Sequence, residues 1–211
     1  MKTENKQHWD NVYETKSPEQ VSWTQEVPET SLALIRSFGL PGNARIIDVG
    51  GGDSKLVDCL LEEGFENVTV LDISAKALDK AKKRLGEKAD KVRWVVADIT
   101  EYIPDAPFDV WHDRAAFHFL TGEEQIARYM DTARQSVRGY MAIGTFSVNG
   151  PPKCSGLEIK QYDRDGLAAA TRNGFELLAC HTEDHRTPFG TTQNFLFCSF
   201  RRKTDGGNTG A

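Results

Sequence analysis

A run of three glycines between an apolar strand and a helix most limits what this chain can fold into. The segment IIDVGGGDSKL occupies positions 46–56, where apolar residues lead into the glycines and a helical pattern follows. Glycine has no Cβ, so its backbone can lie against a ligand or adopt a positive φ at little steric cost. In α/β proteins a nucleotide-like cofactor binds at such a turn. A tight turn needs only one glycine, so the three predict a binding site.

Strand and helix patterns alternate after this turn. Apolar strands are predicted at 44–49, 68–72, 92–97, 108–113 and 140–146, and helices at 53–63, 74–85, 121–137 and 164–173. Strands that are apolar throughout predict a mainly parallel sheet covered by helices on both faces. After a loop at 147–156, two last strand patterns, at 175–182 and 194–200, predict an antiparallel hairpin at the edge of the sheet.

Two of these helices begin at recognisable capping residues. Ser74 is the predicted N-cap of the second helix. The spacing of Thr121 and Glu124 predicts a capping box at the start of the third, with Val137 on its apolar face.

Length and composition are those of one ordinary globular domain. The 211 residues carry a net charge of -5 without a run of Lys or Arg, which argues against a nucleic-acid partner. The polar first residues contain no signal peptide, and no apolar stretch approaches the ~20 residues that cross a bilayer. We expect a cytoplasmic protein with no membrane partner, built from a helical lid section at 1–42, a cofactor-binding domain at 43–203 and a disordered tail at 204–211.

The four cysteines are scattered and show no CxxC spacing: Cys59, Cys154, Cys180 and Cys198. This pattern predicts reduced thiols rather than disulfides or a zinc site. We expect no bound metal.

Residues around the glycine turn discriminate between cofactors. The dinucleotide fingerprint GxGxxG requires a glycine where Lys55 stands, which disfavours a nicotinamide oxidoreductase. No phosphate loop of the form GxxxxGK[ST] follows the strand. Asp48 and Asp53 flank the turn, where they would repel phosphates and suit a ligand that carries positive charge.

Two further acids end the next two strands. Asp72 follows the second strand, where a carboxylate can accept hydrogen bonds from ribose hydroxyls, and Asp98 follows the third, within reach of an adenine amino group. Either acid alone is as easily a strand-end cap. Together with the glycine turn, they favour a cofactor that contains adenosine.

With these motifs the chain resembles the class I S-adenosylmethionine-dependent methyltransferases. Asp48, Gly50 and Gly52 match the family's acid-and-glycine motif, with Ser54 in place of its last glycine. The resemblance implies an α/β, doubly wound, seven-stranded and mainly parallel sheet of the Rossmann-like type, with an antiparallel last strand. It implies S-adenosylmethionine as the cofactor and S-adenosylhomocysteine as the product. Its expected binding residues are Trp23, Asp48, Gly50, Gly51, Gly52, Asp72, Ile73, Asp98, Ile99 and Asp113.

Three segments resemble a small bacterial-type subgroup, near a mitochondrial citrate synthase lysine methyltransferase. They are HWDNVY at 8–13, DRAAFHFL at 113–120 and HRTPFG at 185–190. The acceptor stays open: a small molecule comes first, a protein lysine second, and a non-catalytic cofactor-binding protein is a third alternative. The chain is expected to act as a monomer or homodimer.

The segment after the fourth strand should face the acceptor. Asp113 and His118 are the predicted catalytic residues, with His118 either a general base or a hydrogen-bonded packing residue. Trp23 is expected to cover the sulfonium through a cation–π contact, and Trp9 to pack the N-terminal section. Further residues that could line the same mouth, or pair with an anionic substrate, are Cys154, His181, His185 and Arg186.

Overall fold

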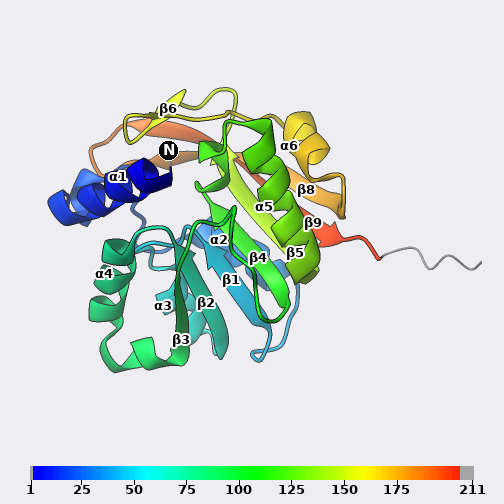
Figure 1. The fold of residues 1–211 in the computed structure, drawn as a ribbon, viewed down its shortest axis with the longest axis horizontal. Coiled ribbons are helices and arrows are strands. Elements are labelled where there is room, and N and C mark those ends of the chain that lie inside the picture. Colours follow the sequence, from blue (N-terminus) through cyan, green and yellow to red (C-terminus); the bar gives the residue numbers. More distant parts are fainter. Residues whose placement is uncertain (1, 205–211) are drawn as a thin grey trace, which may run out of the picture.

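The computed structural model describes residues 2–204, and its central layer is a seven-stranded sheet (Figure 1). The strand order is β3-β2-β1-β4-β5-β9-β8. The parallel strands are β1 (Arg45–Val49), β2 (Asn67–Asp72), β3 (Val92–Val96), β4 (Phe108–Arg114) and β5 (Val137–Phe146). The last two are β8 (Phe175–Arg186) and β9 (Thr192–Arg202), and β9 runs antiparallel to both β5 and β8. The expected fold, including the antiparallel last strand, is confirmed. The predicted tail lies outside the described residues except for Thr204.

Helices cover both faces of this sheet because successive strand residues point to opposite sides. Ile46 of β1 packs in one apolar cluster with α2 (Glu29–Ser37), α3 (Leu56–Glu62) and α4 (Ala75–Leu85). Its neighbour Ile47 packs in the other, with α5 (Glu123–Ser136) and α6 (Arg164–Thr171). In Figure 1, α5 accordingly lies in front of the sheet, and α2 and α3 lie behind it.

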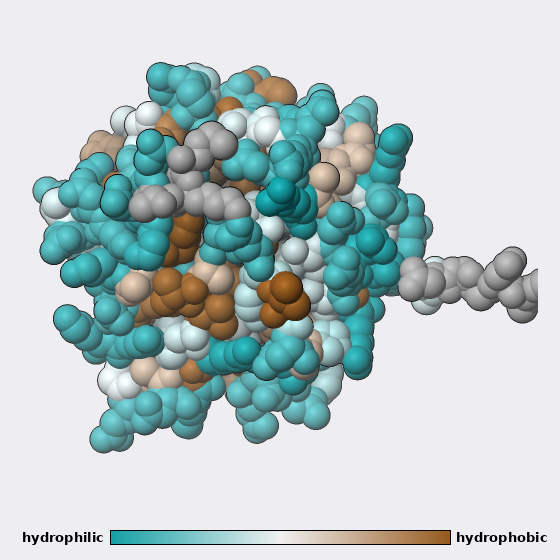
Figure 2. Space-filling model, in the orientation of Figure 1, coloured by the Kyte–Doolittle hydropathy of each residue, from teal (hydrophilic) through white to brown (hydrophobic). Residues whose placement is uncertain are grey.

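One stretch of the front face has no helix over it. Residues 97–107, between β3 and β4, form turns without a helix in the described chain. Ile103 is 88% exposed and Val96 is 50% exposed, and Figure 2 shows apolar side chains gathered in the middle of this face. No described helix is long and apolar enough to cross a bilayer.

The helix caps only partly follow the sequence. Ser74 caps α4 as predicted, because its Oγ accepts a hydrogen bond from the Ala77 backbone N–H at 3.2 Å. At α5 the N-cap is Gly122 and not Thr121; the Gly122 N–H donates to Oε1 of Gln125 at 3.2 Å. The prediction for Val137 was also wrong, since its backbone pairs with β4 and opens strand β5.

The C-terminal hairpin is longer than predicted. It also brings together two cysteines that were expected to be reduced thiols. Cys180 of β8 lies directly opposite Cys198 of β9, and the two form a disulfide across a Cα–Cα distance of 4.1 Å. Spacing along the chain did not indicate the pair, because the antiparallel register brings together residues 18 positions apart. Cys59 and Cys154 are free. A second, short hairpin begins in the predicted loop after β5 and extends just past it, with β6 (Lys153–Cys154) paired to β7 (Leu157–Glu158).

The N-terminal section begins with α1 (Lys2–Thr15), which is tied to α4. Ser74 Oγ donates to Oδ1 of Asp10 at 2.7 Å, and Nζ of Lys80 donates to the Lys16 carbonyl at 2.8 Å. These bonds hold α1 beside the carboxyl ends of β1 and β2.

Candidate functional site

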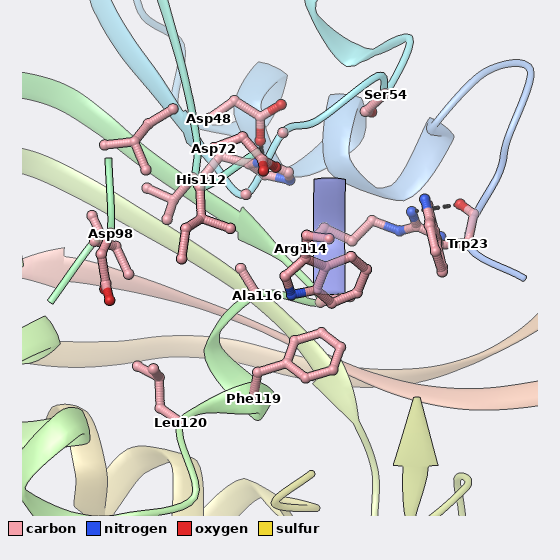
Figure 3. A pocket seen from close by; sticks show the side chains of 18 of the residues that line it. Trp23, Asp48, Ser54, Asp72, Asp98, His112, Arg114, Ala116, Phe119 and Leu120 are labelled. Atoms are coloured by element: carbon pink, nitrogen blue, oxygen red, sulfur yellow. Dashed lines mark hydrogen bonds and ion pairs between the residues drawn. The ribbon is translucent and has the colours of Figure 1, made fainter. Parts of the chain in front are cut away.

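A cavity lies at the carboxyl ends of β1, β2, β3 and β4 (Figure 3). The strand order reverses between β1 and β4, and open α/β sheets bind ligands at such a switch point. Most of the predicted binding residues line the cavity: Trp23, Asp48, Gly50, Gly51, Asp72, Ile73, Asp98 and Ile99. The predicted residues outside its lining are Gly52, Asp113 and His118.

The glycine turn is shaped by its own neighbours as much as by a ligand. Gly50 and Gly52 have φ values of +66° and +52°. An added Cβ would approach a different atom at each glycine: Ala116 Cβ at 2.5 Å from Gly50, Asp48 Oδ2 at 2.6 Å from Gly51, and Tyr13 Oη at 2.5 Å from Gly52. The packing of the turn therefore accounts for all three glycines, contrary to the expectation that it needs only one. Although the glycines pack closely against these segments, the backbone of Gly50 and Gly51 also lines the cavity.

The two strand-end acids present carboxylates to the cavity. Asp72 Oδ1 accepts a hydrogen bond from the Ser74 backbone N–H at 2.8 Å, and burial raises the pKa of Asp72 to about 7. Asp98 Oδ1 accepts from the backbone N–H and the hydroxyl of Thr100, at 2.9 and 2.7 Å. Ile73 and Ile99, one residue after each acid, line the cavity with their apolar side chains. This combination suits a ligand with a flat apolar ring and hydroxyl or amino donors at its edge.

Asp48 belongs to a buried chain of polar side chains that the sequence did not indicate. Its Oδ1 lies 2.7 Å from Nδ1 of His112, and Nε2 of His112 lies 2.8 Å from Oγ of Ser31. All three residues are at most 3% exposed and line the cavity. Asp48 is thus held from the adjacent strand β4, and its register opposite His112 was not readable from the local motif.

Four aromatic rings form a cluster at the cavity. Trp9 contacts Trp23 edge to face with ring centroids 5.8 Å apart, and contacts Phe119 in the same way at 5.1 Å. Tyr13 lies 6.2 Å from Trp23. All four line the cavity, including Trp9, for which only packing of the N-terminal section was expected. We call these residues the aromatic cluster: Trp9, Tyr13, Trp23 and Phe119.

The segment that carries Trp23 is fastened to the sheet. Arg114 Nη1 donates to the Trp23 carbonyl at 2.9 Å, which Figure 3 shows as a dashed line. His185 Nε2 lies 2.6 Å from the Ser22 carbonyl, and the Thr30 hydroxyl donates to Glu183. The N-terminal section is therefore bound to both β4 and β8 beside the cavity.

The predicted catalytic residues lie inside the core. Asp113 is fully buried, and its carboxylate accepts from the backbone N–H groups of Ala116 and Phe117, at 2.9 and 3.0 Å, and from the Tyr129 hydroxyl at 2.7 Å. His118 is also fully buried, and its Nδ1 accepts from the Phe146 N–H at 3.2 Å. The Asp113 carboxylate thus caps the backbone of the turn after β4, and the His118 ring is packed in the core.

Of the further residues that could line the cavity, only one does so. Cys154 lines the cavity, and burial raises the pKa of its thiol to about 12, so that it is neutral. His181 and His185 are not in the lining, and Arg186 is exposed in the last hairpin.

Comparisons with known proteins agree with this geometry. Residues 46–139 match the family described as a methyltransferase domain. The mouse eEF1A lysine and N-terminal methyltransferase is 23% identical over 82% of this chain, which spans only about a quarter (24%) of that relative's length.

Solved methyltransferases share the fold. A SAM-dependent methyltransferase from Anabaena variabilis aligns with a TM-score of 0.73 and 16% identity, over 96% of this chain and 95% of its own. The N-methyltransferase NodS from Bradyrhizobium japonicum, solved with S-adenosylhomocysteine, aligns with a TM-score of 0.73 and 14% identity, over 94% and 98%. A didemethyltoxoflavin N1-methyltransferase from Burkholderia thailandensis aligns with a TM-score of 0.67 and 19% identity, over 96% and 85%.

The donor set of the cavity fits the cofactor of these proteins. Asp72 and Asp98 offer acceptors to hydroxyl and amino groups, and the aromatic cluster offers π faces to a cationic sulfur. Bare glycine backbone lies between the two ends. S-adenosylmethionine is the cofactor that such a site fits, and the chain combines a methyltransferase domain at residues 46–139 with the fold of solved S-adenosylmethionine-dependent methyltransferases.

Proposed function

We propose that the chain transfers a methyl group to a small-molecule acceptor held against the aromatic cluster. The cofactor supplies a methyl group already activated on a positively charged sulfur. The protein therefore has to bind the two reactants, align them and exclude water. Alignment of this kind contributes roughly 7–11 kcal/mol toward lowering a reaction barrier.

Each part of the cofactor has residues that would hold it. Asp72 would accept from the ribose hydroxyls and Asp98 from the adenine amino group. Ile73 and Ile99 would enclose the adenine, and Trp23 would face the sulfonium. The lining of the cavity by all five residues supports these assignments.

The acceptor would have to enter in a reactive protonation state. The surroundings of His118 disfavour a general base, because burial lowers its pKa to about 3 and its proton-accepting Nδ1 already binds the Phe146 N–H. Both oxygens of Asp113 bind donors of the core. We infer that the residues predicted as catalytic act by supporting the segment that lines the cavity, residues 114–120.

Replacement of His118 tests this view. His118→Ala should lower the free energy of unfolding by roughly 2–4 kcal/mol, because it removes a buried ring and leaves a buried N–H unpaired. Affinity for S-adenosylhomocysteine should stay near that of the wild type. Chemical denaturation and calorimetry measure the two quantities, with exposed His181→Ala as the control. Normal stability combined with lost methyl transfer would restore the general-base hypothesis.

We propose a small acceptor because the cavity is enclosed. The aromatic cluster lines one side, and the segment that bears Trp23 is held by bonds to both β4 and β8. A small molecule can be enclosed by such a wall, whereas a folded protein would have to insert a single side chain. The didemethyltoxoflavin N1-methyltransferase acts on a small molecule by its name.

A protein lysine is the second candidate, favoured by the similarity to the mouse eEF1A methyltransferase. A cofactor-binding protein without catalysis is the third. A cytoplasmic location and a monomeric or homodimeric state stay predictions.

One labelling experiment separates these candidates. The protein is incubated with S-adenosylmethionine labelled on the methyl group and with cell extract, and the products are separated by size. We expect label in the small-molecule fraction. Label confined to protein would favour the lysine acceptor. Bound cofactor with no labelled product in any fraction would favour the non-catalytic reading.

A further inference from the structure

Arg114 lines the cavity, and only part of its guanidinium group is hydrogen-bonded. It is the last residue of β4 and the only Lys or Arg in the described lining. Its Nη1 donates to the Trp23 carbonyl, whereas its Nε and Nη2 are buried and have no hydrogen-bond partner among the described residues. Buried donors of a charged group are costly to leave unpaired, so this edge of Arg114 points to a missing ligand.

The surroundings leave the Arg114 guanidinium charged but give its Nε and Nη2 no hydrogen-bond acceptor. Burial lowers the pKa of Arg114 to about 10, which still leaves it protonated at neutral pH. Its Cζ lies 5.3 Å from the centre of the Phe195 ring, a cation–π contact that occupies a face and none of its N–H groups. No carboxylate of the described chain lies within 4.0 Å of it, although Glu183 and Asp48 act on it electrostatically from farther away.

The free atoms specify the shape of the ligand. Nε and Nη2 form one edge of the planar guanidinium, with two N–H groups that are nearly parallel. Such an edge matches the two oxygens of a carboxylate in a bidentate pair. Figure 3 shows Arg114 beside Trp23, across the cavity from Asp98. An anion placed here lies away from the acid that would read the adenine amine.

We propose that the Nε and Nη2 edge of Arg114 binds a carboxylate of a molecule held in the cavity. The proposal rests on the methyltransferase function above and adds the charge of one bound group. Two molecules could bring that carboxylate: the amino-acid end of the cofactor, or an acidic acceptor. Each source predicts a different pattern of binding.

The test compares ligands with and without a carboxylate. Calorimetry measures S-adenosylhomocysteine, which has the amino-acid end, and 5′-deoxy-5′-methylthioadenosine, which lacks it. Benzoate and acetate are then titrated into protein saturated with S-adenosylhomocysteine. The variant is Arg114→Met, with Arg114→Lys to restore the charge without the fork and exposed Arg186→Met as the matched control.

Arg114→Met should weaken one carboxylate ligand roughly 10- to 100-fold, as expected for the loss of a charge-assisted bidentate pair. Selective loss of S-adenosylhomocysteine identifies the cofactor's carboxylate. Loss of benzoate or acetate alone identifies an acidic acceptor. Arg114→Lys should recover part of either affinity, and Arg186→Met should resemble the wild type.

Binding of 5′-deoxy-5′-methylthioadenosine shows whether each variant keeps a folded adenosine site. If Arg114→Met binds every ligand as the wild type does, the proposal is overturned. If the wild type binds neither adenosine compound, the methyltransferase function fails, whatever Arg114 does. A variant that loses the carboxylate-free nucleoside as strongly as S-adenosylhomocysteine would assign Arg114 a purely structural role and also overturn the proposal.

Discussion

Asp72→Ala should weaken the binding of S-adenosylhomocysteine by roughly 100-fold or more. Hydrogen bonds to a charged group are worth about 1.5–3 kcal/mol each, and the ribose hydroxyls would lose two of them. The control is Asp53→Ala, which removes a nearby charge that is not part of the cavity lining. Calorimetry measures both affinities. Equal affinities for Asp72→Ala and the wild type would show that Asp72 is an ordinary strand-end cap.

The same carboxyl should make binding depend on pH. In the free protein, burial raises the pKa of Asp72 to about 7, so the acceptor form is lost as the pH falls below 7. Affinity for S-adenosylhomocysteine should therefore drop between pH 7 and pH 6, by at most tenfold per unit. Asp72→Asn should flatten this dependence, because its amide does not titrate.

The stability of the cofactor-free protein should depend on pH in the opposite direction to its affinity for S-adenosylhomocysteine. Folding raises the pKa of Asp72 from 3.8 to about 7, so the ionised side chain disfavours the folded state as the pH rises through this range. Without cofactor at pH 8, Asp72→Asn should therefore resist denaturant better than the wild type. The difference should shrink as the pH falls toward 4. A less stable Asp72→Asn protein at pH 8 would contradict the raised pKa.

Gly50→Ala should abolish cofactor binding and destabilise the fold. An alanine at the φ of +66° costs about 1–2 kcal/mol in any surroundings. Its Cβ would also lie 2.5 Å from the Cβ of Ala116, so the turn or the segment after β4 has to move. Both segments line the cavity, and a shift in either one disturbs the site.

Gly39 provides a matched control. Its φ is +62°, and an added Cβ would meet no atom within 4 Å. Gly39→Ala should therefore lose only the backbone term and keep normal affinity for S-adenosylhomocysteine. Denaturation curves and calorimetry on both variants separate strain from collision. Equal losses of stability and unchanged binding in both would show that the contact with Ala116 is easily relieved.

The sheet and the position of its strand-end acids were predictable because their signals are local. An apolar run followed by glycines predicts a strand and a turn, whatever lies elsewhere in the chain. Asp72 and Asp98 follow such runs directly, and the carboxyl ends of parallel strands share one edge of the sheet. The position of these acids at the cavity therefore needed no knowledge of packing.

The surroundings of the carboxyl end of β4 were not predictable, because distant residues meet there. Asp113 lies near the carboxyl end of its strand as Asp72 does, yet its carboxylate turns into the core, where Tyr129 of α5 donates to it. Arg114, one residue later, faces the cavity and binds the carbonyl of Trp23, 91 positions earlier in the chain. The same limit hid the pairing of Cys180 with Cys198.

The sequence alone was thus enough to locate the acids at the ends of the strands. The direction of each side chain depends on packing against α5, the N-terminal section and the last hairpin. The reason is physical: the direction of a side chain follows from the partners that can satisfy its polar atoms, and here those partners come from segments far away in the sequence.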